Sequence, residues 1–196
     1  MNPPNDKLLP RLDEECKHTK TAFLLTGKPR MGKSTMVKKL VNAIGSHLCG
    51  GFYTEEITNS GERIGFRCVS VSGESVEIAN VENPSKIRVG RYGIDVNQFE
   101  NFAIQVLEDA LPVKKVIVID EIGFMQMLSA SFQKKIQEIF SGNHVVLGTV
   151  PVDSHPEIDK IKYTKSVKII DLNEHNRDSI TAVLVKDILR ALDSSR

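Results

Sequence analysis

The feature that most constrains the fold of this chain is a glycine-rich loop between a short apolar segment and a helix-like segment. Residues 21–26 read TAFLLT and residues 27–34 read GKPRMGKS. Residues 33–46 then carry apolar side chains at helical spacing, at Val37, Leu40, Val41 and Ile44. A short apolar run that ends at a glycine is typical of a buried strand, and the periodicity after the loop is typical of an amphipathic helix. The segment therefore predicts a strand, a loop and a helix, a unit found in sheets that carry helices on their faces.

The loop fits the pattern G-x-x-x-x-G-K-S/T, which binds nucleotide phosphates when a strand precedes it and a helix follows. Gly27 and Gly32 allow the backbone to curl until successive N–H groups point at one anion. Lys33 is expected to reach the terminal phosphates, and the Ser34 hydroxyl to bind Mg²⁺. The residues expected to contact the nucleotide in this region are Gly27, Lys28, Pro29, Arg30, Met31, Gly32, Lys33, Ser34 and Thr35.

Strand-like and helix-like segments alternate along the rest of the chain. The predicted strands span 50–57, 63–71, 75–81, 113–121, 144–150 and 166–172, and the predicted helices span 97–110, 129–141, 157–163 and 174–192. This alternation predicts an α/β fold, with a mostly parallel sheet and helices on both of its faces. Turn residues separate the strands within about 50–81, so we expect a small antiparallel insert there, followed by a loop over 82–95.

Length and local composition predict one domain behind a polar tail. The chain has 196 residues, and a single domain usually has roughly 150. Residues 1–20 hold three prolines and mixed charges without a sustained period, which predicts a flexible N-terminal tail. Residues 21–196 are expected to form the domain.

The balance of charges and the spacing of the cysteines exclude several classes of protein. With 26 Lys and Arg against 25 Asp and Glu, the net charge is +1, so nucleic-acid binding is not indicated. No apolar run approaches the ~18 residues of a membrane span, and the N-terminus lacks a secretory or transit pattern. Cys16, Cys49 and Cys68 form no zinc or disulfide pattern, and the five histidines have no metal-ligand spacing. We expect a cytoplasmic protein, with the nucleus left open, that is a monomer with no membrane contact and no indicated partner protein.

Two adjacent carboxylates follow the most continuous β-branched run of the chain. Asp120 and Glu121 come directly after VIVI at residues 116–119, and α/β proteins bind ligands at the carboxyl ends of buried parallel strands. Asp120 is expected to support Mg²⁺ together with Ser34. Glu121 is expected to orient or deprotonate a water molecule in line with the terminal phosphate. A base in this position favours hydrolysis over transfer to a bulky acceptor.

Other polar residues have both a functional and an ordinary structural interpretation. Thr149 ends a predicted strand, where it could hydrogen-bond the attacking water or the terminal phosphate. Asn176 and Arg177 open a predicted helix, where they could contact the base, the ribose or a phosphate. The ordinary interpretations are a threonine at a strand end, a helix cap and a solvated charge.

A basic loop and a pair of acidic residues leave the same choice open. In RVGRYG at residues 88–93, Arg91 could offset negative charge in the transition state and Tyr92 could stack on the base. Glu55 and Glu56 could contact a metal-bound water or the ribose. A basic surface turn and a solvated strand edge are the structural alternatives.

Several ordered sequence blocks resemble one family, the small P-loop nucleoside-triphosphatases that include thermophile enzymes and the human cancer-related nucleoside triphosphatase. The resemblance covers about residues 21–192. The blocks are GKPRMGKS at 27–34, GFYTEE at 51–56, RIGF at 63–66, RVGRYG at 88–93, VIDEIG at 118–123, LGTVP at 147–151 and Asn176-Arg177. The phosphate-binding loop is shared by a very large superfamily, whereas GFYTEE, RVGRYG and DEIG in this order are far more specific.

The resemblance implies a RecA-like P-loop fold and Mg²⁺-dependent hydrolysis of nucleoside triphosphates, such as ATP and GTP, to diphosphate and phosphate with loose base preference. By position, it implies that Gly27 to Ser34 hold phosphate, that Asp120 supports Mg²⁺ and that Glu121 is the catalytic base. Lys33 is the second expected catalytic residue, because it would stabilise charge together with Mg²⁺. The chain departs from the family pattern DEIGKMEL at Phe124 and Gln126, which puts any role of the replaced glutamate in doubt. Two other functions stay open, a nucleoside or nucleotide kinase and a nucleotide-gated binding module with slow turnover.

Overall fold

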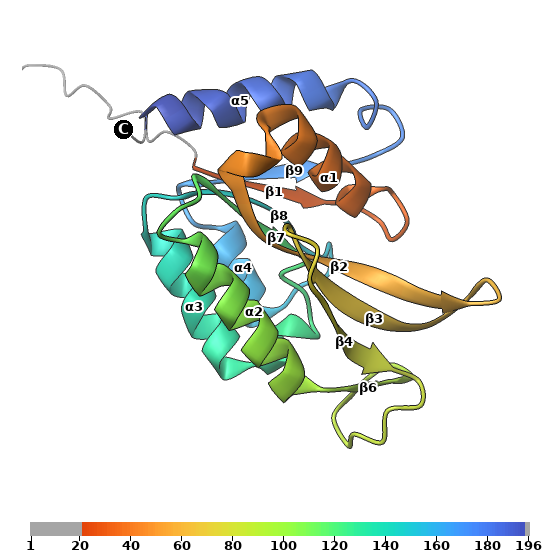
Figure 1. The fold of residues 1–196 in the computed structure, drawn as a ribbon. Helices are drawn as coiled ribbons and strands as arrows, with labels where there is room; N and C mark the ends of the chain where they lie inside the picture. The colour runs from red at the N-terminus through yellow and green to blue at the C-terminus, as the bar shows by residue number, and fades with distance from the viewer. Residues whose placement is uncertain (1–20, 195–196) are drawn as a thin grey trace, which may run out of the picture.

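The computed structural model describes residues 21–194, which contain a single nine-stranded sheet covered by helices (Figure 1). The strands are β1 (Ala22–Thr26), β2 (Cys49–Asn59), β3 (Glu62–Ser70), β4 (Ser75–Asn80), β5 (Arg88–Val89), β6 (Tyr92–Ile94), β7 (Val116–Asp120), β8 (Val145–Thr149) and β9 (Val167–Asp171). The helices are α1 (Lys33–Ile44), α2 (Val96–Ala110), α3 (Ala130–Ser141), α4 (Pro156–Lys162) and α5 (Ile180–Ser194), with short 3₁₀ turns η1 (Ser46–Leu48) and η2 (Gln126–Leu128). The tail predicted for residues 1–20 lies outside the described residues.

Across the sheet the strands lie in the order β5-β6-β4-β3-β2-β7-β8-β1-β9. The pairs β2–β7, β7–β8, β8–β1 and β1–β9 are parallel. Every residue of β7 and of β8 is buried, which explains their continuous apolar sequences, since a strand covered on both faces has no solvent side. The carboxyl ends of β1, β7 and β8 consequently meet at one edge of the sheet.

Helices cover both faces of the sheet, as predicted (Figure 1). Val116 and Val118 of β7 pack in the cluster that contains residues of α1 and α5. The alternate residues Ile117 and Ile119 pack in the cluster that contains residues of α2, α3 and α4. The alternation follows from the two-residue period of a strand, and it confirms the α/β architecture of the P-loop fold.

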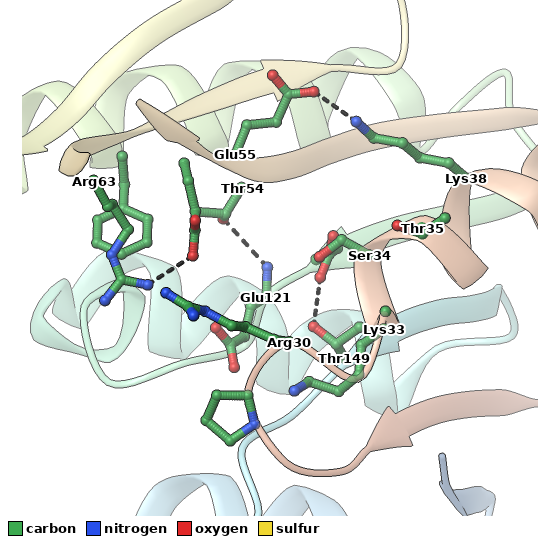
Figure 2. A pocket seen from close by; sticks show the side chains of 15 residues that line it. Arg30, Lys33, Ser34, Thr35, Lys38, Thr54, Glu55, Arg63, Glu121 and Thr149 are labelled. Atoms are coloured by element: carbon green, nitrogen blue, oxygen red, sulfur yellow. Dashed lines mark hydrogen bonds and ion pairs between the residues drawn. The ribbon is translucent and has the colours of Figure 1, made fainter. Parts of the chain in front are cut away.

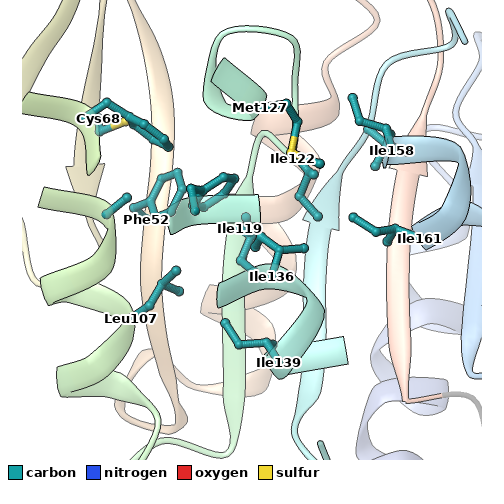
Figure 3. Close-up of a cluster of buried hydrophobic side chains, with 14 of the residues drawn as sticks. Phe52, Cys68, Leu107, Ile119, Ile122, Met127, Ile136, Ile139, Ile158 and Ile161 are labelled. Atoms are coloured by element: carbon teal, nitrogen blue, oxygen red, sulfur yellow. The ribbon is translucent and has the colours of Figure 1, made fainter. Parts of the chain in front are cut away.

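The larger core layer lies between the sheet and helices α2, α3 and α4 (Figure 3). Phe52, Phe99 and Phe132 contact one another there, with ring centroids 5.0 to 6.1 Å apart. One ring comes from β2, one from α2 and one from α3, and all three side chains are fully buried. The three rings therefore hold β2 against α2 and α3 close to the carboxyl edge of the parallel strands.

The antiparallel part of the sheet differs from the predicted insert at both of its ends. Residues Cys49 to Tyr53 of β2 pair with β7 and so belong to the parallel part of the sheet. Beyond Tyr53, β2 pairs only with the antiparallel strand β3. The predicted loop over 82–95 is wrong for β5 and β6, because β6 pairs with β4 at Ala79–Ile94 and Asn80–Gly93. Strands this short have no periodic pattern of their own, so only pairing reveals them.

The last helix also begins later than predicted. Residues 174–179 form turns and α5 starts at Ile180. The reason is a local hydrogen-bond network: the Asn176 side chain accepts from Asn173 N (3.0 Å) and donates to Asp171 O (2.8 Å). None of the helices within residues 21–194 combines the length and the apolar character that a bilayer crossing requires.

Candidate active site

The loop between β1 and α1 requires glycine at its two ends. Gly27 has φ 142° and Gly32 has φ 92°, both in the region that side chains disfavour. A Cβ on Gly27 would also lie 2.5 Å from Leu172 O, which no real contact allows. The loop therefore curls tightly beside the chain that leaves β9. The Lys33 ammonium, on the first residue of α1, donates to Gly27 O at 2.8 Å and to Lys28 O at 3.3 Å.

A cavity of about 670 Å³ opens beside this loop at the carboxyl edge of the parallel strands (Figure 2). Polar and charged side chains make up most of its wall, and they come from the loop, α1, β2, β3, β7 and β8. The lining residues are Pro29, Arg30, Gly32, Lys33, Ser34, Thr35, Lys38, Thr54, Glu55, Glu56, Arg63, Phe66, Asp120, Glu121 and Thr149. Of the loop residues predicted from the sequence, Gly27, Lys28 and Met31 are not in this wall.

Asp120 is fixed at the end of β7 by the neighbouring strand. Its side chain is 1% exposed, and Thr149 Oγ1 donates to Asp120 Oδ1 at 2.5 Å. Burial raises the pKa of Asp120 above its ordinary value, while the hydrogen bond from Thr149 acts in the opposite direction. Thr149 was expected to meet the attacking water or the phosphate, but its hydroxyl hydrogen is directed at Asp120.

Asp120 and Ser34 suit a divalent cation bound together with phosphate. Asp120 Oδ2 is buried, and no residue in the described range hydrogen-bonds to it. An unpartnered buried carboxylate oxygen is costly unless a cation or donor completes it. Mg²⁺ prefers oxygen ligands and is commonly held by one or two carboxylates and substrate phosphates rather than by a full protein cage. Within residues 21–194, no group of three or more His, Cys, Asp or Glu side chains could hold a metal.

Glu121 lines the cavity, and no residue of the described range hydrogen-bonds its carboxylate. Its backbone N–H donates to Thr54 Oγ1 at 3.3 Å, which ties the residue to β2. Burial is the main cause of a raised pKa of Glu121, and the nearby Asp120 adds to it. Gly123 makes room for the side chain, because a Cβ there would lie 3.0 Å from Glu121 Cδ. Glu121 is thus placed to accept a hydrogen bond from a small molecule in the cavity.

The two other glutamates of the cavity are neutralised by cations. Glu55 contacts Lys38 at 2.6 Å and Arg67 at 2.9 Å, and the Lys38 hydrogen bond is the main cause of its lowered pKa. Glu56 contacts Arg63 at 2.6 Å. Its lowered pKa makes Glu55 a poorer proton acceptor than Glu121, whose pKa is raised, and the Glu56 carboxylate is engaged by Arg63.

Arg91 and Tyr92 do not line the cavity, contrary to the interpretation of their loop as a cover for the nucleotide. Tyr92 is buried and packs edge-on against Phe66, with ring centroids 5.1 Å apart. Arg91 pairs with Glu62, the first residue of β3, at 2.6 Å. The pairing of β5 with β6 folds this loop back onto the antiparallel strands, which its sequence alone does not indicate.

The structure instead brings Arg63 and Phe66 of β3 into the cavity wall. Both were in the sequence block RIGF, which supported the family resemblance, but neither was assigned a role. The alternation of side chains along β3 does not by itself predict that these two residues line the cavity. The antiparallel pairing of β3 with β2 decides which side chains face the phosphate-binding loop.

Asn176 and Arg177 lie after β9, and neither contributes to the wall of the cavity. The Asn176 amide is engaged by the backbone around it, as described above. The Arg177 guanidinium is half-exposed and lies 3.9 Å from the carboxylate of Asp178. A contact of either residue with the nucleotide remains a prediction.

The two departures from the family pattern have different surroundings. Gln126 is 3% exposed, and its Nε2 donates to Thr54 Oγ1 at 3.1 Å, the same oxygen that receives the Glu121 N–H. Phe124 is partly exposed and packs edge-on against His155. Gln126 therefore takes part in the support of Glu121, whereas Phe124 lies at the surface.

Comparisons with known proteins agree with this site. A sequence model of the family described as NTPase matches residues 22–185. The nucleoside-triphosphatase THEP1 of Thermotoga petrophila is 40% identical over 174 residues, which cover 89% of this chain and 94% of the relative. The human cancer-related nucleoside-triphosphatase is 35% identical over 187 residues, covering 88% of this chain and 96% of the relative.

Two solved structures share the fold along nearly their whole length. The crystal structure of THEP1 from Aquifex aeolicus superposes with a TM-score of 0.77 at 35% identity, covering 83% of this chain and 96% of that one. The solution structure of a human cancer-related nucleoside triphosphatase superposes with a TM-score of 0.73 at 34% identity, covering 90% and 99%. The phosphate-binding loop, the buried acidic pair and these likenesses together show that the chain belongs to the small P-loop nucleoside-triphosphatase family and is an NTPase.

Proposed function

We propose that this protein hydrolyses nucleoside triphosphates to diphosphate and phosphate in a reaction that depends on Mg²⁺, with Glu121 as the general base. The observation that carries the proposal is the position of Glu121: its carboxylate shares the cavity with Lys33 and Ser34 and is not engaged by any described residue. A water molecule that donates to this carboxylate would attack the terminal phosphorus, and its proton would pass to Glu121.

The other residues have roles that follow from their positions. The N–H groups of the loop and the ammonium of Lys33 would bind the phosphates, since a loop at a helix N-terminus favours anions. Ser34 and Asp120 would hold Mg²⁺, which supplies positive charge to the phosphate oxygens when bound. Thr149 holds the Asp120 carboxylate in place through its hydrogen bond to Oδ1.

Loose base preference is part of the proposal and comes mainly from the family resemblance. It is supported by Asn176, a candidate for base contact, whose amide oxygen and nitrogen are both engaged in the turns after β9. A side chain whose polar atoms already have partners reads a base less well than a free one. A monomeric state and a cytoplasmic location remain predictions.

The decisive test is phosphate release from ATP, GTP, CTP, UTP and ITP, with Mg²⁺ and with EDTA. Glu121→Gln should lower the turnover at least ~10²-fold, the low end for loss of a general base, and should retain affinity for Mg²⁺ and nucleotide. Glu138→Gln, at an exposed position of α3, is the matched control and should match the wild type. Release that needs no Mg²⁺, or that survives in Glu121→Gln, would contradict the mechanism.

A kinase activity is the second candidate, favoured by one observation. The cavity continues past the loop to Arg63 and Phe66, which leaves room for an acceptor beside the terminal phosphate. Addition of nucleosides and nucleoside monophosphates to the same assay separates the two reactions. Label from the γ-phosphate on the added compound would support the kinase, and label in free phosphate would support the hydrolase.

A further inference from the structure

Arg63 occupies the wall of the cavity that lies across from the phosphate-binding loop (Figure 2). It extends from β3, a strand of the antiparallel extension, whereas Lys33, Ser34 and Glu121 come from α1 and from the chain after β7. The cavity therefore has a cation on the loop side and a second cation on the opposite side. A terminal phosphate bound by the loop would lie between them.

The Arg63 guanidinium is held on several sides. Its Nε donates to Tyr92 Oη at 2.9 Å and its Nη1 donates to Glu56 Oε1 at 2.6 Å. Its central carbon lies 5.0 Å from the ring centroid of Phe66 and 5.6 Å from that of Tyr92, within cation–π distance of both rings. These hydrogen bonds use two of the five N–H donors of an arginine, so the group is oriented without being saturated.

A second arginine, Arg91, contacts both Arg63 and its partner Tyr92. Arg91 donates from Nη2 to the backbone oxygen of Arg63, from Nη1 to Glu62 at 2.6 Å and from Nε to Tyr92 Oη at 3.4 Å. Tyr92 itself is 7% exposed, although its hydroxyl is bonded to charged groups. The short strands β5 and β6 thus place Arg91 and Tyr92 in contact with Arg63, the one arginine of β3 that lines the cavity.

Other cations near the cavity do not have the same geometry. Lys38 is paired with Glu55, and Arg67 is paired with the same glutamate and is not in the cavity wall. Arg30 extends from the phosphate-binding loop and is exposed, and no hydrogen bond or ion pair within residues 21–194 orients it. Arg63 is distinguished by a guanidinium that lines the cavity and is oriented both by hydrogen bonds and by aromatic rings.

We propose that Arg63 is a catalytic residue that contacts the terminal phosphate and stabilises the charge that develops as hydrolysis proceeds, and that Tyr92 is its positioning residue. This inference rests on the proposed function. In the reaction a water oxygen forms a bond to the terminal phosphorus, the bond from phosphorus to the diphosphate oxygen breaks, and Glu121 receives the water proton. Arg63 gains and loses no atom; its hydrogen bonds to the phosphate oxygens strengthen in the transition state.

The first experiment compares Arg63→Ala, Arg63→Lys and the control Arg67→Ala, which removes an arginine of the same strand that lies outside the cavity wall. Arg63→Ala should lower kcat by roughly 10²- to 10³-fold, at or somewhat below the gain typical of an arginine in phosphoryl transfer. Affinity for ADP should stay within ~3-fold, because the contact forms mainly in the transition state. Arg63→Lys should restore little, since a lysine cannot reproduce the planar group.

A purely structural role for Arg63 would give a different result in two further measurements. Added guanidinium at millimolar concentration should raise the kcat of Arg63→Ala and not that of the wild type. Binding of ADP with aluminium fluoride and Mg²⁺, a mimic of the transition state, should weaken roughly as much as kcat falls. A structural defect would lower the affinity for ADP as well and would not respond to guanidinium.

Tyr92→Phe tests the positioning residue. It removes the hydroxyl that accepts from Arg63 and keeps the buried ring, so the fold should be retained. We expect kcat to fall roughly 10-fold with KM unchanged, since misplacement of a catalytic group lowers the rate of the chemical step.

The outcomes separate this inference from the proposed function. If the wild type releases no phosphate, the proposed function fails first. If release is Mg²⁺-dependent and lost in Glu121→Gln but Arg63→Ala retains the wild-type kcat, the hydrolase stands and the role of Arg63 is overturned. Equal loss in Arg63→Ala and Arg67→Ala, or loss without guanidinium rescue and with weaker ADP binding, would also overturn it.

Discussion

Thr149 and Asp120, which end neighbouring strands β8 and β7, are joined by a hydrogen bond of 2.5 Å between Oγ1 and Oδ1. Both side chains are 1% exposed. The bond engages one carboxylate oxygen of Asp120 and leaves the other, Oδ2, without a partner among the described residues. A buried carboxylate in this state is oriented by the protein and still has an oxygen available to a cation or its water.

Replacement of Thr149 by valine should therefore affect both the stability and the metal dependence of the reaction. Thr149→Val keeps the shape of the side chain and removes the donor, so a buried carboxylate oxygen loses its partner, at a cost of about 1–3 kcal/mol in the free energy of unfolding. The Mg²⁺ concentration needed for half-maximal turnover should rise. Urea titration and a Mg²⁺ titration of phosphate release measure the two effects. Thr149→Ser, which retains the hydroxyl, should behave like the wild type, and an unchanged Mg²⁺ dependence in Thr149→Val would contradict the role.

Lys33→Ala should weaken nucleotide binding and abolish turnover. The ammonium is the charge that begins α1 and lies over the loop, 2.8 Å from Gly27 O, where the phosphates are expected. The contact is expected to form with the bound nucleotide and to strengthen in the transition state, so its removal should raise Kd and lower kcat as well. Titration of a fluorescent triphosphate analogue and a turnover assay give both numbers. Lys39→Ala, on an exposed part of the same helix, serves as the control. Near-normal turnover in Lys33→Ala would contradict the assignment of the loop as the phosphate-binding site.

Gly123→Ala should lower the rate with little effect on nucleotide affinity. A Cβ at this position would lie 2.9 Å from Gln126 Oε1 and 3.0 Å from Glu121 Cδ, so the base must shift. A small displacement of a catalytic group is enough to cost on the order of 10²-fold in rate. Steady-state kinetics with ATP, beside the Kd for ADP, checks the prediction. Gly142→Ala is the matched control, because its Cβ would meet nothing closer than 3.4 Å. Normal kcat in Gly123→Ala would show that the position of Glu121 is not critical.

The ion-pair cluster of Glu55 predicts a specific dependence of stability on pH. Hydrogen bonds and charges from Lys38 and Arg67 hold the pKa of Glu55 below its ordinary value of 4.5. A carboxyl whose folded pKa is lowered stabilises the protein above its unfolded pKa, and this contribution disappears as the pH falls through the folded value. Glu55→Gln should therefore be less stable than the wild type at pH 7, by about 1 kcal/mol for partly exposed pairs.

The difference in stability between the wild type and Glu55→Gln should shrink once the pH is lowered below about 4.5. Urea denaturation at a series of pH values measures it. Glu74→Gln, which changes an exposed glutamate in the turn before β4, is the control for the substitution itself. A constant difference for Glu55→Gln across the series would mean that the substitution acts through packing rather than through charge.

Local sequence determined the parts of this protein whose chemistry is contained in a short segment. The loop from Gly27 to Ser34 could be recognised from its residues, because glycine spacing, a lysine and a hydroxyl at the start of a helix are sufficient for phosphate binding. The strand Val116–Asp120 could be recognised from its uninterrupted β-branched run, which only a strand buried on both faces tolerates. The acidic pair at its end followed from the same pattern.

Tertiary structure decided everything that depends on pairing between distant segments. The strands β5 and β6 are too short to show a period. The pairing of β6 with both β4 and β5 places Arg91 and Tyr92 beside Arg63 rather than in the wall of the cavity. Thr149 became the partner of Asp120 because β8 lies next to β7, a neighbour relation that strand order alone establishes. Glu55 and Glu56 are paired with Lys38 and Arg63, each at 2.6 Å, and these partners come from other elements of the fold. The physical reason is the same in each case. A sequence pattern reflects how one helix or strand is buried, whereas the partner of a side chain depends on how different helices and strands pack together.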